Sequence, residues 1–309
     1  MTDIVLIGCG SIAKKHHANI LRLGSDVVAA ADPEMRYIPP NIKHKYADPD
    51  ECLKEHADGS TVVIASPSKF HAAQAFKAME YGCKALLVEK PLGINMADVD
   101  GLAEYAETNN VRAAVAYNYR FHRVVHDVLH PAQHDQDGMQ RFLHISSTDD
   151  IRTWPNYRPG CYMLDPMGGG VLLTCATHSI DMAVHLFGEA ENVSASIIYD
   201  KENSGLDTDA VVRIVHKSQG VSWMGTRWNR PPHSVIGYVS GKSADSFDLL
   251  SPSCERDRSH MHLWMMEMFL IYADGGDRGR LCTFEEAVHT VRIIDAAKQS
   301  WNERTDVKL

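Results

Sequence analysis

The first 120 residues of this 309-residue chain alternate short apolar runs with longer amphipathic segments. Continuous apolar runs of strand length are typical of strands covered on both faces, as in a parallel sheet. Repeated strand–helix alternation therefore predicts a doubly wound α/β fold with right-handed crossovers. The expected strands are Ile4–Gly8, Val27–Ala31, Val62–Ala65, Ala85–Val88 and Ala113–Ala116; the expected helices are Lys14–Leu23, Pro49–His56, Phe70–Tyr81 and Ala97–Asn109.

The pattern changes after about residue 120, where apolar runs follow one another with only short polar breaks. Consecutive strands without intervening helices indicate a mostly antiparallel sheet. We expect an N-terminal Rossmann domain over residues 1–120 and a C-terminal α+β domain over residues 121–309, built on a large open sheet. Such a sheet buries a face against another subunit, which favours a homodimer or homotetramer. The expected strands are Phe142–Ser147, Val193–Tyr199, Ala210–His216, Val221–Trp228, Ser234–Ser240 and Ser246–Leu250; the expected helices are Leu172–Phe187, His260–Tyr272 and Thr283–Trp301.

A glycine-rich loop, Gly8-Cys9-Gly10-Ser11-Ile12-Ala13, joins the first expected strand to the first helix. The first glycine permits a tight turn, the second lets backbone approach a pyrophosphate, and the small Ala13 allows close packing of helix and strand. Backbone N–H groups and the positive end of the helix then hold the phosphates. The loop predicts a dinucleotide site whose contacts include Gly8, Gly10, Ser11 and Ile12.

Asp32 ends the second expected strand, about twenty residues beyond the loop. A carboxylate at this place accepts hydrogen bonds from the adenine-ribose hydroxyls and repels a 2′-phosphate. We therefore expect NAD as the cofactor, with NADP less favoured. The simpler alternative is a glycine turn followed by a capping aspartate.

Composition excludes several other classes of protein. The formal net charge of -9 argues against nucleic-acid binding, and no apolar run approaches the roughly 20 residues that cross a membrane. The chain enters Ile4–Ile7 without a basic region or cleavage site, so we expect no signal peptide. Seven scattered cysteines and no Cys-x-x-Cys pair indicate reduced thiols and a cytoplasmic location. The 17 histidines are dispersed without zinc-site spacing, and Asp149-Asp150 is expected as a solvated turn, so no metal site is predicted.

Further motifs, in order along the chain, identify a relative. They are Ser66-Pro67 with His71, Glu89-Lys90-Pro91, and Gly168-Gly169-Gly170 leading to His178 and Asp181. This series resembles the glucose-fructose oxidoreductase/inositol dehydrogenase/MocA family over nearly the whole chain, including Cys282–Ala287 and the closing helix. The resemblance implies NAD-dependent hydride transfer at a hydroxyl-bearing carbon of a sugar, polyol or nucleotide sugar.

The same resemblance implies roles for individual residues. Glu89-Lys90-Pro91 closes the Rossmann half, often with a cis bond before the proline, and Lys90 reaches the substrate hydroxyl. A lysine there stabilises an alkoxide, while His178 has a pKa range suited to taking the hydroxyl proton. The expected cofactor contacts in these motifs are Ser66, Pro67, His71, Glu89 and Lys90.

The helix after the glycine cluster departs from the family pattern. Thr174, His178 and Asp181 lie at i, i+4 and i+7 and share one face. The family commonly has an acid where this chain has Thr174, so the acid–base strength or the substrate differs here. We expect Thr174 to meet substrate and Asp181 to be structural.

Two further segments are expected to line the domain cleft. Tyr117–Phe121 follows the last parallel strand, where Asn118 would meet nicotinamide and Arg120 would meet substrate. In the loop 153–158, aromatic and basic side chains suit sugar or nucleotide-sugar rings, although packing or a subunit contact is the alternative. The expected substrate contacts of this loop are Trp154, Tyr157 and Arg158. Trp223 and Trp228 alternate along a strand, which favours sheet packing or a dimer surface.

Three alternatives to a simple dehydrogenase stay open. The first is an NAD-dependent glycosidase or lyase that uses transient oxidation, which the change at Thr174 favours. The second is a reductase of the biliverdin-reductase branch of the same fold. The third is a sensor that binds NAD without catalysis, although the presence of both Lys90 and His178 weighs against it.

Overall fold

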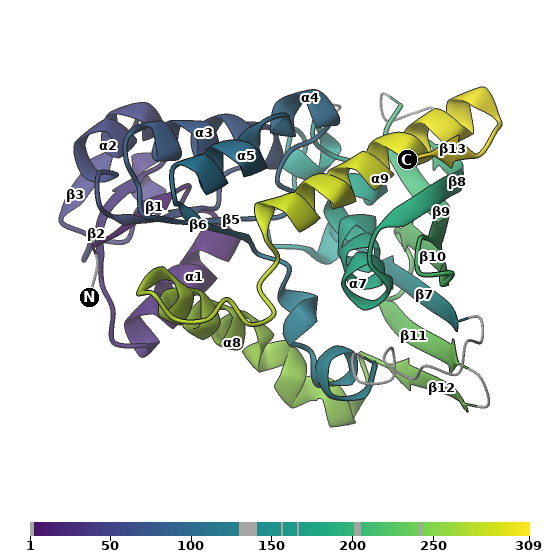
Figure 1. Ribbon diagram of the computed structural model, residues 1–309. Helices are drawn as coiled ribbons and strands as arrows, with labels where there is room; N and C mark the ends of the chain where they lie inside the picture. Colours follow the sequence, from purple (N-terminus) through teal and green to yellow (C-terminus); the bar gives the residue numbers. More distant parts are fainter. Residues whose placement is uncertain (1–2, 130–140, 156, 166, 201–204, 241–242) are drawn as a thin grey trace. The chain divides into compact units, whose positions relative to one another are not determined.

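A computed structural model describes residues 3–129, 141–155, 157–165, 167–200, 205–240 and 243–309 (Figure 1). It divides into two compact units. The first comprises Met1–Asn118 and His260–Val288, and the second comprises Tyr119–Ser259 and His289–Leu309. The expected division into domains 1–120 and 121–309 stays a prediction, and Asn156 of the aromatic loop lies outside the described residues.

The first unit contains a fully parallel six-stranded sheet in the order β3-β2-β1-β4-β5-β6. Its strands are β1 (Ile4–Ile7), β2 (Val27–Ala31), β3 (His44–Tyr46), β4 (Thr61–Ile64), β5 (Ala85–Val88) and β6 (Arg112–Val115). The central strands β1, β4 and β5 are buried along their whole length, which confirms the two-sided cover expected from their apolar runs. The sequence missed β3, because this edge strand is polar and only partly buried.

Helices cover both faces of this sheet. Figure 1 shows α2, α3 and α5 over one face and α1 against the other. The bounds are α1 (Ser11–Arg22), α2 (Pro49–His56), α3 (His71–Glu80), α4 (Met96–Val99) and α5 (Leu102–Thr108). The expected helix Ala97–Asn109 is divided because Gly101 adopts φ 71°, a left-handed conformation that interrupts the helix.

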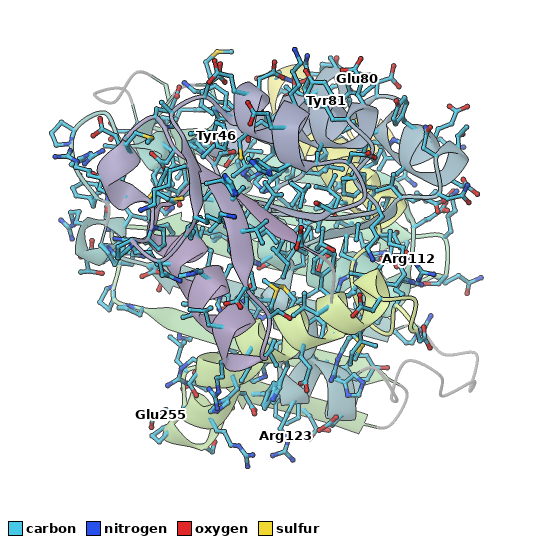
Figure 2. The ribbon with its side chains drawn as sticks, turned by 90° about the vertical axis from the view of Figure 1, so that its left-hand side faces the viewer. Tyr46, Glu80, Tyr81, Arg112, Arg123 and Glu255 are labelled. Carbon is cyan, nitrogen blue, oxygen red and sulfur yellow. The ribbon has the colours of Figure 1, made fainter. Side chains whose placement is uncertain are left out.

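Residues 260–288 join the first unit through backbone and ring contacts with β6. Arg112, labelled in Figure 2, donates hydrogen bonds to the carbonyls of Tyr272 and Gly276 at 3.2 and 3.4 Å. Its guanidinium lies 5.3 Å from the centre of the Tyr272 ring, and Val115 pairs with Cys282 in a β-bridge. The helices of this region are α8 (Glu255–Ala273) and α9 (Phe284–Glu303), each of which contributes residues to both units.

The second unit contains a seven-stranded sheet in the order β12-β11-β7-β10-β9-β8-β13. The sheet is mostly antiparallel, as expected, although β7 and β10 pair in parallel. Its bounds are β7 (Arg141–Asp149), β8 (Ala190–Tyr199), β9 (Asp207–His216), β10 (Val221–Trp228), β11 (His233–Ser240), β12 (Ser243–Asp248) and β13 (Val307–Lys308). The two tryptophans of β10 point to opposite faces, because side chains alternate along a strand and these two are an odd number of residues apart. Trp228 is accordingly 3% exposed, whereas Trp223 is 47% exposed.

The helix that carries His178 begins with a π-helical turn, Leu172–Ala176, and continues as α7 (Thr177–Phe187). Asp207 of β9 accepts a hydrogen bond from the backbone N–H of Leu172 at 2.6 Å and so holds the start of this helix. Gly170 adopts φ 91° and passes so close to Asp207 that an added Cβ would lie 2.1 Å from its carboxylate. Among the described residues, no helix has the length and apolar character needed to cross a membrane.

His216 is a buried titratable group of the second sheet. Its Nδ1 lies 2.8 Å from the Gly188 carbonyl oxygen, and its Nε2 lies 2.8 Å from the Ser222 hydroxyl. Burial lowers the pKa of His216 from 6.5 to about 4, although the Gly188 contact opposes this shift. The folded protein therefore keeps this ring neutral over a range in which the unfolded chain takes up a proton.

We expect this difference to make the protein less stable in acid. The stability that depends on the neutral His216 ring is fully present above pH 6.5 and is lost as the pH falls towards about 4. The full loss is about 3 kcal/mol, at 1.36 kcal/mol per pKa unit. Urea unfolding at pH 7, 5.5 and 4.5 measures it, and His216→Asn should show a weaker pH dependence than the wild type. Equal pH dependence in both proteins would refute the assignment.

Candidate functional site

The glycine loop at the end of β1 adopts the tight turn that its sequence predicts. Gly8 has φ 83°, and an added Cβ would lie 2.6 Å from the Ser66 backbone nitrogen. The backbone N–H of Gly8 donates to the Ala31 carbonyl at 2.8 Å. Gly8 is therefore required both by its own conformation and by the close approach of the chain after β4.

Gly10 is a different case, because an added Cβ would meet nothing within 4 Å. Internal packing does not require a glycine here, so the open space suits a group that approaches from outside. Gly10 is also the N-cap residue of α1, and no side chain caps this helix. The first N–H groups of α1 and its positive dipole end therefore fit an anion such as a pyrophosphate. Ser11 is exposed and Ile12 is half-buried in this first turn.

Asp32 lies at the end of β2, where its carboxylate anchors the loop. Oδ2 accepts a hydrogen bond from the Cys9 N–H at 2.7 Å, and Oδ1 accepts one from the Glu34 N–H at 2.8 Å. A carboxylate has about four acceptor positions, so these two bonds leave capacity for ribose hydroxyls. Asp32 thus fits both the structural and the cofactor interpretations made from the sequence.

The chain segments after β4 and β5 are joined by His71 at the start of α3. Its Nδ1 lies 2.7 Å from the Pro91 carbonyl oxygen and its Nε2 lies 2.7 Å from the Ser66 carbonyl oxygen. Burial lowers the pKa of His71 although both contacts oppose the shift. The ring is 1% exposed. It braces the Ser66–Pro67 loop against the Lys90-Pro91 turn, and its direct contact with cofactor stays a prediction.

Lys90 follows β5 in a turn with a cis Lys90-Pro91 peptide bond. Its neighbour Glu89 is buried, with Oε1 2.7 Å from Nε2 of His16 on α1. Glu89 Oε2 accepts a hydrogen bond from the Lys90 N–H at 3.2 Å. Burial by itself raises the pKa of Glu89, but the hydrogen bond with His16 and the positive charge of Lys90 outweigh it, so the pKa is lowered. The ionised Glu89 therefore fixes the backbone that carries Lys90.

Sequence reasoning missed His16 and His262, because no spacing links α1 or α8 to Glu89. Burial lowers the pKa of His262 to about 3, with the nearby Lys15 adding to the effect and Glu89 opposing it. His16 stands one helical turn beyond the glycine loop. The buried contact between His16 and Glu89 connects α1, the helix of the glycine loop, to the Lys90 turn.

In the second unit, His178 lies half-buried on α7 beside Tyr119. The two rings meet edge to face with their centres 5.1 Å apart. Burial raises the pKa of Tyr119, and the nearby Cys175 and Asp149 raise it further. Tyr119 and Cys175 are therefore neighbours of the predicted proton acceptor that sequence reasoning did not assign.

Thr174 points its hydroxyl into its own helix. Its Oγ1 donates to the Gly170 carbonyl at 2.7 Å, and the residue is 3% exposed. The position that holds an acid in the family pattern thus carries a hydroxyl engaged by backbone. The expected contact between Thr174 and substrate stays a prediction.

Arg120 is buried in an ion pair with Asp181 of α7. Its Nη2 donates to Oδ1 at 2.6 Å and its Nε donates to Oδ2 at 2.9 Å. The side chains are each 1% exposed. This geometry supports the structural role expected for Asp181 and gives the Arg120 guanidinium a protein partner. A substrate contact of Arg120 stays a prediction, as does a nicotinamide contact of the buried Asn118 of the first unit.

The aromatic loop of the second unit is partly anchored. The indole N–H of Trp154 donates to Asp149 Oδ2 at 3.0 Å, and Asp150 caps the short 3₁₀ helix Ile151–Thr153. Tyr157 and Arg158 are exposed. Asp149-Asp150 therefore contributes to loop structure, and the sugar-binding role of Trp154, Tyr157 and Arg158 stays a prediction.

The first unit combines a parallel sheet with a glycine loop, an aspartate at the end of β2 and a Glu-Lys-Pro turn after β5. These features define a dinucleotide-binding fold of the oxidoreductase type. A family model described as "Oxidoreductase family, NAD-binding Rossmann fold" matches residues 2–117. A second family model, described as "GFO/IDH/MocA C-terminal domain", matches residues 138–244. Together they cover well over half of the chain, which belongs to the GFO/IDH/MocA oxidoreductase family. The family resemblance, the fold and NAD as the cofactor type are thereby confirmed, and the open cradle at Gly10 fits that cofactor.

Individual relatives are distant. The chain is 27% identical over 227 residues to a myo-inositol 2-dehydrogenase of Thermotoga maritima, covering 70% of this chain and 65%, just under two thirds, of that relative. It is 28% identical over 317 residues to oxidoreductase P35 of Formosa agariphila, covering 94% and 96% of the two chains. The scyllo-inositol dehydrogenase of Lactobacillus casei, solved with NAD(H) and scyllo-inositol, superposes with a TM-score of 0.84 at 16% identity, over 100% and 99% of the chains. This last likeness shows the shared fold.

Proposed function

We propose that the protein is a dehydrogenase that transfers a hydride between NAD and a hydroxyl-bearing carbon of a sugar, polyol or nucleotide sugar. The observation that carries the proposal is the Glu89-Lys90-Pro91 turn at the carboxyl end of β5. Ligands bind at this end of the strands in open α/β sheets. The buried Glu89 holds the turn and connects it to the helix of the phosphate loop through His16.

The chain's own residues prepare the hydroxyl, while NAD supplies the hydride acceptor. His178 takes the hydroxyl proton, since an imidazole accepts protons near neutral pH. Lys90 stabilises the negative charge that develops on the oxygen. Tyr119 packs against His178 and limits the orientation of its ring. No metal takes part in this step.

The similarity to the myo-inositol 2-dehydrogenase named above supports this substrate class. A screen that follows NADH absorbance with a panel of inositols, sugars, sugar phosphates and nucleotide sugars tests the proposal. We expect NADH to accumulate with at least one member of the panel. Product analysis in the same screen separates the alternatives, because a transient-oxidation glycosidase cleaves its substrate without net NADH. A biliverdin-type reductase consumes NADH instead, and NAD binding without turnover of any compound contradicts the proposal.

Asp32 is proposed to set the preference for NAD over NADP. Asp32→Asn removes the charge and keeps one acceptor oxygen for the Cys9 N–H, whereas its amide nitrogen cannot replace the oxygen that accepts from the Glu34 N–H. We expect the ratio of kcat/KM for NAD to that for NADP to fall about tenfold or more, because hydrogen bonds to a charged group contribute about 1.5–3 kcal/mol. Asp32→Ala is the matched control and should weaken both cofactors, since it also releases the loop. An unchanged ratio in Asp32→Asn contradicts the assignment.

A homodimer or homotetramer is proposed to form through the open face of the second sheet. Phe142, Trp223 and Val239 are each more than 40% exposed on this face and surround a shallow apolar depression. Exposed apolar patches of this kind are typical of protein interfaces. The mass of the protein in solution, measured by light scattering, tests this.

All seven cysteines are free thiols, which supports the proposed cytoplasmic location.

A further inference from the structure

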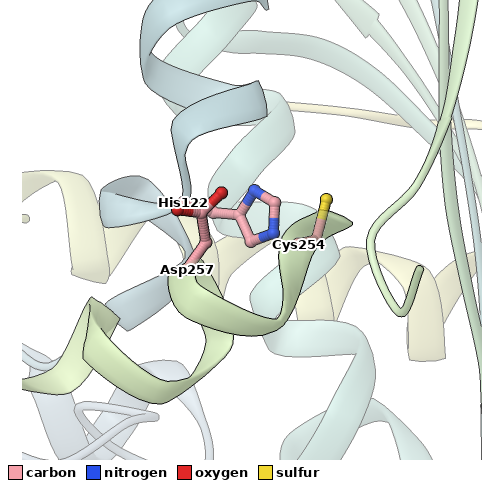
Figure 3. A group of neighbouring side chains, drawn as sticks. All are labelled: His122, Cys254 and Asp257. Atoms are coloured by element: carbon pink, nitrogen blue, oxygen red, sulfur yellow. The ribbon is translucent and has the colours of Figure 1, made fainter. Parts of the chain in front are cut away.

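Three buried side chains of the second unit form a cluster with no part in the proposed hydride transfer. Figure 3 shows His122, Cys254 and Asp257 as neighbouring side chains. One ligand atom from each residue lies within 4.8 Å of the other two. His122 follows the short helix Asn118–Phe121, Cys254 ends the 3₁₀ turn Pro252–Cys254, and Asp257 lies in the first turn of α8.

The His122 ring provides an independent sign of a missing ligand. The residue is 0% exposed, and its Nε2 is a buried polar atom with no hydrogen-bond partner in the described part of the chain. A buried polar atom without a partner calls for an explanation such as an ion or an ordered water.

We propose that His122, Cys254 and Asp257 bind one borderline-soft divalent cation of the zinc class. An imidazole nitrogen, a thiolate and a carboxylate oxygen are the donor types that Zn²⁺ takes, whereas Mg²⁺ and Ca²⁺ take oxygen donors alone. The thiolate and carboxylate together offset the two positive charges, so the loaded site is neutral in a buried environment. A water molecule completes the tetrahedral set.

Binding changes one existing contact. The Val124 N–H donates to His122 Nδ1 at 3.3 Å. Coordination through Nε2 moves the ring proton to Nδ1, so this bond is given up. Its length lies just beyond the usual range of about 2.7–3.2 Å, so the bond is weak. Arg258 stays in place, because its Nη1 donates to the carbonyls of Leu249 and Ser251, each at 3.0 Å.

The cation would have a structural role. It would join the segment after Tyr119 to the first turn of α8, two parts of the second unit that are distant in sequence. Tyr119 stands three residues before His122 and contacts His178. The metal would thereby stabilise the wall beside the proposed proton acceptor without touching the reacting groups. The inference does not depend on the proposed dehydrogenase activity.

Titration of metal-stripped full-length protein with Co²⁺ tests the proposal, because cobalt replaces zinc and reports its ligands by absorption. We expect about one equivalent to bind, with a near-ultraviolet thiolate-to-cobalt band and visible d–d bands that Zn²⁺ then abolishes. Cys254→Ser should lose the thiolate band. Cys161→Ser removes another buried thiol of the same unit and is the matched control, which should keep it.

Asp257→Asn preserves the size of the side chain and should weaken Co²⁺ binding by more than the roughly 10–100-fold that loss of an outer-shell partner costs. The wild-type titration tests the proposal even if Cys254→Ser fails to fold. If excess Co²⁺ gives no thiolate band with the wild-type protein, the proposal is overturned. A band that survives in folded Cys254→Ser also overturns it. The same holds if Cys175→Ser, which removes the one partly exposed thiol, abolishes the band instead.

Discussion

Lys90→Met should reduce turnover by about 10²–10³-fold while NAD still binds, because it removes the positive charge that stabilises the developing oxyanion. Methionine keeps much of the length and apolar stem of lysine, so the turn held by Glu89 should persist. Steady-state kinetics on a substrate found in the NADH screen gives kcat, and the quenching of protein fluorescence gives the NAD dissociation constant. The expected result is a fall in kcat that is much larger than any loss of NAD affinity.

Lys84→Met is the matched control for this variant. Lys84 lies in the same unit immediately before β5, and its side chain is 43% exposed and lies 4.0 Å from Asp274. We expect Lys84→Met to keep wild-type kinetics.

His178→Asn should give a further test, because loss of a general base lowers the rate by about 10²–10⁴-fold. Near-wild-type turnover by both Lys90→Met and His178→Asn rules out the catalytic assignment.

Arg120→Met should destabilise the second unit by about 3–5 kcal/mol, because it leaves the Asp181 carboxylate buried without its guanidinium partner. The measurement is the free energy of unfolding from urea titration followed by circular dichroism. The double variant Arg120→Met/Asp181→Leu removes both charges and should recover much of this loss.

The same pair of variants separates the structural role of Arg120 from the substrate contact expected from its sequence position. A substrate contact predicts a raised KM with unchanged stability, and the double variant would not restore KM. The buried pair predicts a large loss of stability that the double variant reverses in part. Arg123→Met is a matched control, since Arg123 is an exposed arginine of the same segment whose pair with Asp127 is solvated.

Much of the fold followed from local patterns in the sequence. The apolar runs at Ile4 and Ala85 became fully buried parallel strands, because a short continuous apolar run has no polar face and suits a strand covered on both sides. The edge strand His44–Tyr46 was missed for the converse reason, since an exposed polar strand has no such pattern. Gly101 divided an expected helix through a backbone conformation that amphipathic periodicity does not report.

The candidate site was predicted less completely. Asp32 and the Lys90 turn lie where the sequence placed them, at the carboxyl ends of β2 and β5, because strand ends are marked by the chain itself. The substrate contact expected for Arg120 stays a prediction, and its ion pair with Asp181, which is 61 residues away, gave no signal in the sequence. The partner of Glu89, His16, is 73 residues away and gave no signal in any motif.

The sequence by itself determined the alternation of strands and helices, the glycine turn at Gly8 and the family. Each of these depends on backbone preferences or on residues close together in the chain. Only the tertiary structure decided which polar groups meet: His16 with Glu89, Arg120 with Asp181, and His122 with Cys254 and Asp257. The physical reason is that burying a polar group is tolerated only with a partner, and that partner is supplied by whichever element packs there.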